Sequence, residues 1–222
     1  MKNTIKGFGV LILYIVMMSI PIDFLYLFGI NYNNLSIIAK QIYLIIYESL
    51  LLFIIFYIYK KDIINNFKDF KINYLKYIKK YYIYWFIMLF LMILSNKIIT
   101  IFTTTNISEN EQIIIKQLNI MPVYILITTI LISPILEELV FRISFKKMFP
   151  NTNILFILSS GIMFGFIHVI SSINNLIDLL FIIPYSIPGF IFAYLYTKSN
   201  NIFVPISIHI FHNLIMMLIQ II

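Results

Sequence analysis

The sequence predicts an all-α fold: a polytopic membrane helix bundle with about seven transmembrane helices. Hydrophobic residues make up 61% of the 222 residues, and the mean hydropathy is +0.97. Charged residues make up only 11%, whereas soluble domains carry about a quarter. The apolar residues also gather in runs close to the roughly 20 residues that a bilayer-spanning helix needs. These observations together indicate an integral, multi-pass membrane protein.

The expected spans follow one another along the chain and are separated by short polar segments: residues 8–30, 36–59, 81–102, 120–142, 153–172, 175–197 and 202–222. Lys2 and Lys6 precede the first span as in a signal peptide. The apolar stretch runs to about Ile30 without a small-residue cleavage site, so we expect a retained first helix. We expect the fourth span to continue as helix towards Phe149, because Pro150 gives the first clear stop signal.

The basic residues predict the orientation of the chain. The net charge is +7, and a cytoplasmic N-terminus places thirteen of the sixteen lysine and arginine residues on the cytoplasmic side. Only Lys40, Lys97 and Lys116 then lie outside, as the positive-inside rule favours. We therefore expect insertion in the cytoplasmic membrane with the C-terminus outside, and the lipid bilayer, not nucleic acid, as the partner of these charges. Segment 103–119 is expected to be an outer loop. The absence of cysteine excludes disulfides and thiolate chemistry.

The basic segment 60–80 allows two interpretations. It mixes lysines with Phe67, Phe70, Tyr74 and Tyr77, a composition that suits an amphipathic helix on an anionic membrane surface. An ordinary basic cytoplasmic loop explains the same composition more simply, and we favour that interpretation.

Two adjacent carboxylates and an arginine interrupt the fourth span, at Glu137, Glu138 and Arg142. Ionisable residues are costly inside a membrane, so they usually face a protein interior or cavity and indicate function. Glu138 and Arg142 are i,i+4 neighbours on a helix and can pair. Glu137 points about 100° away from Glu138 and is left available. Glu48 also lies in mid-span, but we expect a structural role for it, hydrogen-bonded by Ser49 or a tyrosine.

We expect the polar residues of the fifth and seventh spans, His168, His209 and Asn213, to lie close to Glu137. His168 ends the run Gly161-Ile-Met-Phe-Gly165-Phe-Ile-His168, whose two glycines allow another helix to approach closely. His209 and Asn213 are i,i+4 neighbours on one face of the seventh span, and His212 flanks that face. The competing interpretations are a histidine bonded to a carbonyl in the core, and interhelical hydrogen bonds that hold helices together.

With these residues in view, the chain resembles the CPBP family of intramembrane proteases, which comprises type II CAAX prenyl endopeptidases and bacteriocin-processing or Abi proteins. Three motifs carry the resemblance across about the last hundred residues: Glu137-Glu138-Leu-Val-Phe-Arg142, Phe164-Gly-Phe-Ile-His168 and His209-Ile-Phe-His-Asn213. Ile143 departs from the glycine that often follows the arginine in this family. The resemblance divides the chain into residues 1–119, with three N-terminal spans and the basic segment 60–80, and residues 120–222, a CPBP-like catalytic helix core.

The resemblance implies an endopeptidase that cleaves a membrane-associated or hydrophobic peptide or protein, of the prenylated or bacteriocin type. Glu137 and His168 would activate a water, and His209 and Asn213 would donate hydrogen bonds to the oxyanion. Glu138 and Arg142 would support the site. A zinc ion is the alternative, with Glu137, His168 and His209 as ligands. We favour a metal-free mechanism, because the zincin spacing is absent and Asn213 is a poor zinc ligand.

Two other functions fit the same motifs. An immunity protein would protect its host from a bacteriocin by binding it without cleavage. A proton-coupled transporter could also use Glu and His in its helices as a proton relay, but the sequence shows no inverted repeat that would support this function.

Overall fold

The computed structural model describes residues 2–102, 109–170, 173 and 175–221, and this part of the chain contains helices and no strands. The all-α prediction is therefore confirmed. The α-helices are α1 (Lys2–Ser19), α2 (Pro21–Tyr26), α3 (Ile37–Ile58), α4 (Lys60–Tyr81), α5 (Ile83–Phe102), α6 (Glu109–Ile120), α7 (Pro122–Ile127), α8 (Ser133–Glu138), α9 (Phe145–Met148), α10 (Asn153–Ile170), α11 (Ile182–Ser199) and α12 (Phe203–Ile221). Two short 3₁₀-helices, η1 (Tyr32–Asn34) and η4 (Leu176–Phe181), and two π-helical stretches, η2 (Thr128–Ile132) and η3 (Leu139–Ser144), complete the described elements.

Six of the described helices are long and apolar enough to cross a membrane: Ile37–Ile58, Ile83–Ile101, Pro122–Met148, Asn153–Ile170, Leu176–Ser199 and Phe203–Ile221. They agree with the last six expected spans to within a few residues, apart from the C-terminal extension of the fourth. The first expected span, 8–30, is different. Helix α1 ends at Ser19, before Pro21, which opens the six-residue helix α2. Proline lacks the N–H that would continue the helical hydrogen bonds, and its ring disfavours helical backbone before it.

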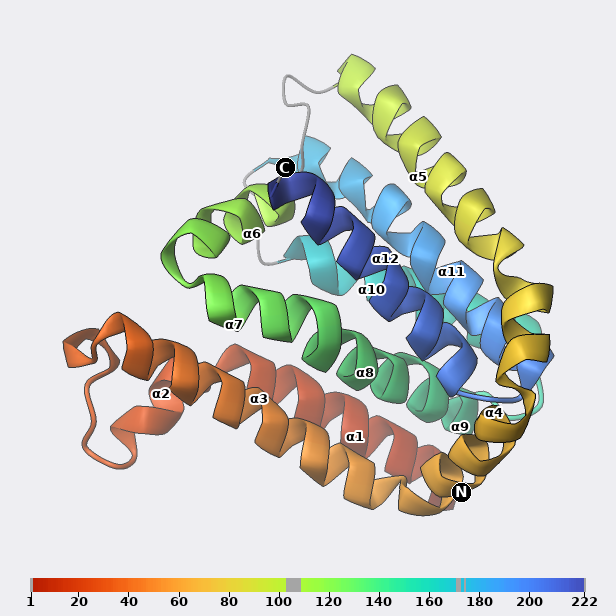
Figure 1. The fold of residues 1–222 in the computed structure, drawn as a ribbon, viewed down its shortest axis with the longest axis horizontal. Coiled ribbons are helices and arrows are strands. Elements are labelled where there is room, and N and C mark those ends of the chain that lie inside the picture. The colour runs from red at the N-terminus through yellow and green to blue at the C-terminus, as the bar shows by residue number, and fades with distance from the viewer. Residues whose placement is uncertain (1, 103–108, 171–172, 174, 222) are drawn as a thin grey trace.

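The fourth span is one continuous 27-residue helical run, Pro122–Met148, in which η2 and η3 alternate with α7, α8 and α9. Its extension towards Phe149 is confirmed, because α9 ends at Met148. This run passes through the middle of the bundle, with α1 and α3 along one side and α12 along the other (Figure 1). Half of its most hydrophobic window is buried, the largest share among the six spans, so ionisable side chains on it can avoid lipid.

The basic segment is a helix, and the interpretation as an ordinary loop is wrong. Helix α4 covers Lys60–Tyr81, with Asp62 in its first turn and Lys79 and Lys80 in its last, as the helix dipole favours. It is also docked against the turn before α12: the Asn201 side chain donates hydrogen bonds to the carbonyl of Asn66 at 2.8 Å and to Oδ2 of Asp69 at 2.7 Å. These long-range contacts could not be inferred from local composition.

The expected outer loop 103–119 is in part helical. Residues 103–108 lie outside the described part of the chain, whereas α6 begins at Glu109 and runs to Ile120, directly before the fourth span.

The close approach expected from the glycines of the fifth span occurs between α10 and α11. The Cα of Gly161 lies opposite Gly189: a Cβ added at Gly189 would come within 2.8 Å of that atom. A Cβ added at Gly165 would collide with Ser186. The two helices therefore pack backbone to backbone, which fixes α10, and with it His168, against the rest of the core.

Candidate active site

The two glutamates lie between the two π-helical stretches. Helix α8 is only six residues long, with η2 immediately before it and η3 immediately after it. Pro134 lies in the first turn of α8 and lacks a backbone N–H donor, which accounts for a break from regular α-helical hydrogen bonding at this point. π-Helical turns of this kind occur often at functional sites.

Glu138 and Arg142 form the pair that their spacing predicts. The Arg142 Nε and Nη2 atoms donate to the two carboxylate oxygens of Glu138 at 2.8 and 3.0 Å. Both side chains are completely buried. Arg142 also donates to the hydroxyl of Ser160 at 2.5 Å and lies over the rings of Phe164 and Phe192. The buried guanidinium of Arg142 therefore has partners on α8, α10 and α11, which offset its desolvation.

Glu137 faces two imidazoles from two other spans. Its Oε2 atom lies 3.8 Å from Nε2 of His168 and 3.9 Å from Nε2 of His209. Both separations are too long for a direct hydrogen bond. They are short enough for one small polar molecule, such as water, to bridge the carboxylate and an imidazole. Glu137 and His209 are buried, whereas the His168 side chain is 25% exposed, so the site is more open on the side of α10.

His209 also contacts Glu138, a relationship that sequence reasoning missed. Its Nδ1 atom lies 3.1 Å from Oε1 of Glu138. A carboxylate paired with arginine accepts hydrogen bonds and cannot donate them, so Nδ1 carries the proton of this contact. The imidazole therefore lies between the two adjacent glutamates, and its ring stacks on Phe192 with centroids 4.7 Å apart. No local pattern links residues 71 positions apart, so only the fold reveals the contact.

The other polar residues of α12 are placed differently from the expected cluster. Asn213 donates through Nδ2 to the carbonyl of Thr129 in η2 at 2.8 Å, and the structure gives it no hydrogen bond to Glu137 or to the imidazoles. His212 is buried, and its Nδ1 has no hydrogen-bond partner within the described residues. Asn213 thus lies beside the π-helical stretch that precedes the glutamates.

Glu48 is held by residues of the fourth span. The hydroxyl of Tyr124 donates to its Oε1 atom at 2.5 Å, and the hydroxyl of Thr128 donates to its Oε2 atom. A tyrosine is thus a partner, as expected, whereas the expected alternative Ser49 is replaced by Thr128. The carboxylate joins α3 to α7 and η2, so this second buried glutamate fixes the helix that carries Glu137.

Zinc is the alternative to a metal-free site, with Glu137, His168 and His209 as its ligands. Protein nitrogen and oxygen ligands lie about 2.0–2.2 Å from zinc. Across the described ranges, no group of three or more His, Cys, Asp or Glu side chains is arranged to hold a metal ion. His209 contacts Glu138 through Nδ1, and its Nε2 is the nitrogen that faces Glu137. The mechanism proposed below uses the protein side chains.

Comparison with known proteins shows which protein family the segment with these residues is similar to. Residues 119–215 match the family described as type II CAAX prenyl endopeptidase Rce1-like. The resemblance inferred from the three motifs is confirmed for this part of the chain, which contains Glu137, His168, His209 and Asn213. The described residues contain six helices that are long and apolar enough to cross a bilayer, so the chain is an integral, multi-pass membrane protein.

A particular relative is the Bacillus subtilis (strain 168) protein named "Putative membrane peptidase YdiL", which is 36% identical over 115 residues. The match covers 51% of this chain and 43% of the relative, so the two correspond over less than half of the relative's length. No solved structure matches the chain significantly.

Proposed function

We propose that the protein is an intramembrane endopeptidase that hydrolyses a peptide bond of a membrane-associated or hydrophobic substrate. The observation that carries this proposal is the approach of the Glu137 carboxylate to the Nε2 atoms of His168 and His209, at 3.8 and 3.9 Å. Three groups that can accept or release protons then surround one position inside the bundle, where a water can be held and activated. The similarity to a prenyl endopeptidase family and to a named peptidase supports the same reaction class.

In the proposed reaction, Glu137 takes a proton from the water, and the resulting hydroxide attacks the carbonyl carbon of the scissile bond. His168, the more exposed of the two imidazoles, takes this proton over from Glu137 and gives it to the departing amine as the C–N bond breaks, so both side chains return to their starting protonation. Glu138 stays paired with Arg142 and holds His209 through Nδ1. Glu138 is thus a positioning residue and takes no proton from the water.

Asn213 and His209 are the proposed hydrogen-bond donors to the oxyanion that forms when hydroxide adds to the carbonyl carbon. An asparagine amide has two N–H donors, and the contact with the Thr129 carbonyl uses one of them. The second remains for a substrate oxygen that enters beside η2. His209 adds a hydrogen bond when both of its ring nitrogens carry protons. Removing one such donor in other enzymes lowers kcat by about 10²–10³-fold.

The distribution of lysines supports a cytoplasmic-membrane location with the N-terminus inside, as expected from the sequence. Substrates of two kinds suit the proposal, prenylated peptides and bacteriocin-type peptides, and both should be tried as probes in the test below.

The test is hydrolysis by the purified full chain in lipid nanodiscs, offered hydrophobic and prenylated peptides in ¹⁸O-labelled water. Hydrolysis places one labelled oxygen in each new C-terminal carboxylate, which mass spectrometry detects. We expect cleavage by the wild type and by Asp23→Asn, which removes an exposed carboxylate on α2, and none by Glu137→Gln.

Labelled product from folded Glu137→Gln at the wild-type rate would remove Glu137 from the mechanism. The immunity alternative has its own outcome: protection from a bacteriocin that survives Glu137→Ala would mean binding without hydrolysis.

A further inference from the structure

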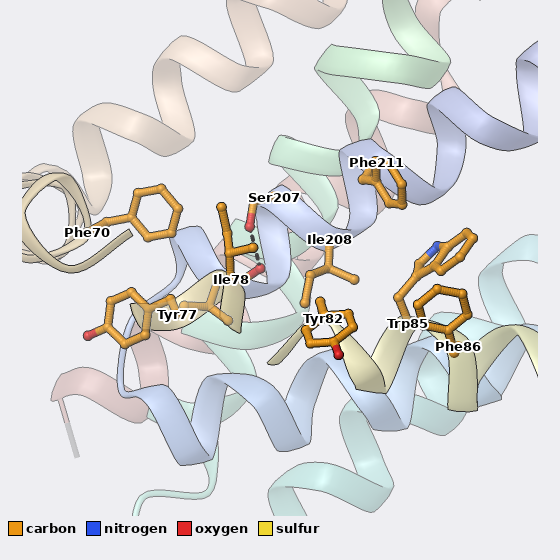
Figure 2. A pocket seen from close by; sticks show the side chains of 10 residues that line it. Phe70, Tyr77, Ile78, Tyr82, Trp85, Phe86, Ser207, Ile208 and Phe211 are labelled. Atoms are coloured by element: carbon orange, nitrogen blue, oxygen red, sulfur yellow. Dashed lines mark hydrogen bonds between the residues drawn. The ribbon is translucent and has the colours of Figure 1, made fainter. Parts of the chain in front are cut away.

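An aromatic groove lies on the outside of the bundle, away from the glutamates. It has a volume of about 460 Å³ and lies where the end of α4, the start of α5 and the face of α12 meet. Ile78 and Tyr82 line it from the α4 side, Trp85 and Phe86 from α5, and Ile208 and Phe211 from α12 (Figure 2). Its size lies within the range of about 300–1,000 Å³ that is typical of small-molecule sites.

A basic stripe on α4 leads to this groove. Six exposed residues follow one another at intervals of three or four along one face of the helix and its C-cap: Ile64, Lys68, Lys71, Leu75, Lys79 and Tyr82. Such spacing places them on one side of the helix. Both acids of the helix, Asp62 and Asp69, lie on another face, because neither falls at these intervals. The stripe thus combines positive charge with apolar side chains and ends at Tyr82, which lines the groove.

The connections of α4 place this stripe at a membrane surface. Helix α4 joins the end of α3 to the start of α5, and both of these helices are long and apolar enough to span the bilayer. Its two ends therefore lie at the same face of the membrane. At about 1.5 Å per residue, its 22 residues cover about 33 Å. A helix of this kind, with exposed lysines beside Ile72 and Leu75, suits the boundary between headgroups and acyl chains.

The groove also offers a polar contact. The indole Nε1 of Trp85 is buried and has no hydrogen-bond partner in the described part of the chain. Leaving a buried donor unpaired is unfavourable. An ester carbonyl of a lipid, which lies between the phosphate and the acyl chain, is an acceptor of suitable polarity for this N–H.

We propose that the groove binds an anionic phospholipid, with one acyl chain among Trp85, Phe86 and Phe211 and the phosphate held by Lys71 and Lys79. The lysine stripe supplies charge complementarity, which a zwitterionic lipid would not satisfy. This inference does not depend on the proteolytic activity proposed above. It also links lipid to the helix that carries His209, because α4 is bonded to the start of α12 through Asn201.

The groove contains its own reporter, since Trp85 is the only tryptophan in the sequence. The experiment measures quenching of its fluorescence in the full chain, in phosphatidylcholine bilayers that contain increasing amounts of lipid with brominated acyl chains. We expect brominated phosphatidylglycerol to quench Trp85 with at least about tenfold higher affinity than brominated phosphatidylcholine, because each lysine near an anionic headgroup contributes about a factor of five.

Two double variants distinguish specific binding of the headgroup by the lysine stripe from non-specific attraction of anionic lipid by the positive charge of α4. Lys71→Gln/Lys79→Gln should lose the preference for phosphatidylglycerol, whereas Lys76→Gln/Lys80→Gln, with the same charge change on another face of the same helix, should keep it. Ser207→Phe, which fills the groove from α12, should reduce quenching by phosphatidylglycerol to the level of phosphatidylcholine. Equal quenching of wild-type Trp85 by both lipids, equal effects of the two double variants, or no quenching at all would each overturn the proposal.

Discussion

The Nδ1 atom of His209 lies 3.1 Å from Oε1 of Glu138, so a histidine of the last helix is bonded to the carboxylate that Arg142 neutralises. The other ring nitrogen of His209 faces Glu137. One imidazole therefore connects the supporting ion pair to the proposed base. The buried pair of Glu138 and Arg142 thus helps to hold the His209 ring that faces Glu137.

Loss of the buried pair should reduce stability before it affects chemistry. Glu138→Gln leaves the fully buried Arg142 without a counter-charge, and such a loss typically costs about 3–5 kcal/mol. We expect a clearly lower unfolding temperature in detergent, measured by intrinsic fluorescence or calorimetry. Ser160→Ala removes a neutral partner of the same arginine and should cost less. A Glu138→Gln protein as stable as the wild type would mean that the pair is not structural.

Substitutions of the two histidines should affect stability and activity differently. His209→Gln loses the hydrogen bond to a charged carboxylate and the stacking on Phe192, and hydrogen bonds to charged groups contribute about 1.5–3 kcal/mol. His168 is partly exposed and lies beyond direct hydrogen-bond distance of Glu137. We therefore expect His168→Gln to abolish hydrolysis at a nearly unchanged unfolding temperature, and His209→Gln to lower both. Full activity of His168→Gln would exclude it as the acid.

The contact between α10 and α11 should not tolerate an added methyl group. A Cβ at position 189 would come within 2.8 Å of the Cα and carbonyl oxygen of Gly161, so Gly189→Ala must separate the two helices. Overpacking of this kind costs about 1–3 kcal/mol. The matched control is Gly9→Ala, where nothing lies within 4 Å; thermal unfolding should show no loss there. Equal effects at both positions would contradict the close packing.

The link between α4 and α12 should weaken in acid. Hydrogen bonds from Tyr77 and Asn201 lower the pKa of Asp69 below its ordinary value. A carboxylate with a lower pKa in the folded state stabilises the protein above its unfolded pKa, about 3.9, and this contribution is lost as the pH falls through the folded pKa. We expect the unfolding temperature of the wild type to fall more steeply than that of Asp69→Asn below about pH 4. Parallel curves would show that Asp69 does not contribute.

The membrane spans and the pairing of Glu138 with Arg142 were predictable because their sequence signals are local. Apolar runs of bilayer length located six helices, and the i,i+4 spacing of Glu138 and Arg142 was enough to pair them. The exceptions depend on tertiary contacts. Helix α4 has a polar composition that alone suits a loop, and it is held by Asn201, more than 130 residues away. The bond between His209 and Glu138, and the hydroxyl of Thr128 on Glu48, likewise join segments whose distance in sequence carries no signal.

The π-helical stretches on either side of α8 have a consequence for how this chain tolerates insertions and deletions. Removing one residue from a regular transmembrane helix turns everything beyond it by about 100°, which would move Glu137 out of reach of both histidines. A π-turn holds one residue more than an α-turn, so a deletion within Thr128–Ile132 can be absorbed by its return to α-helix. Glu137 would then keep its direction, while the contacts of Thr128 and Thr129 with Glu48 and Asn213 would be lost. A deletion in Thr128–Ile132 would therefore remove the hydrogen bonds of Thr128 and Thr129 while the Glu137 side chain still points towards His168 and His209.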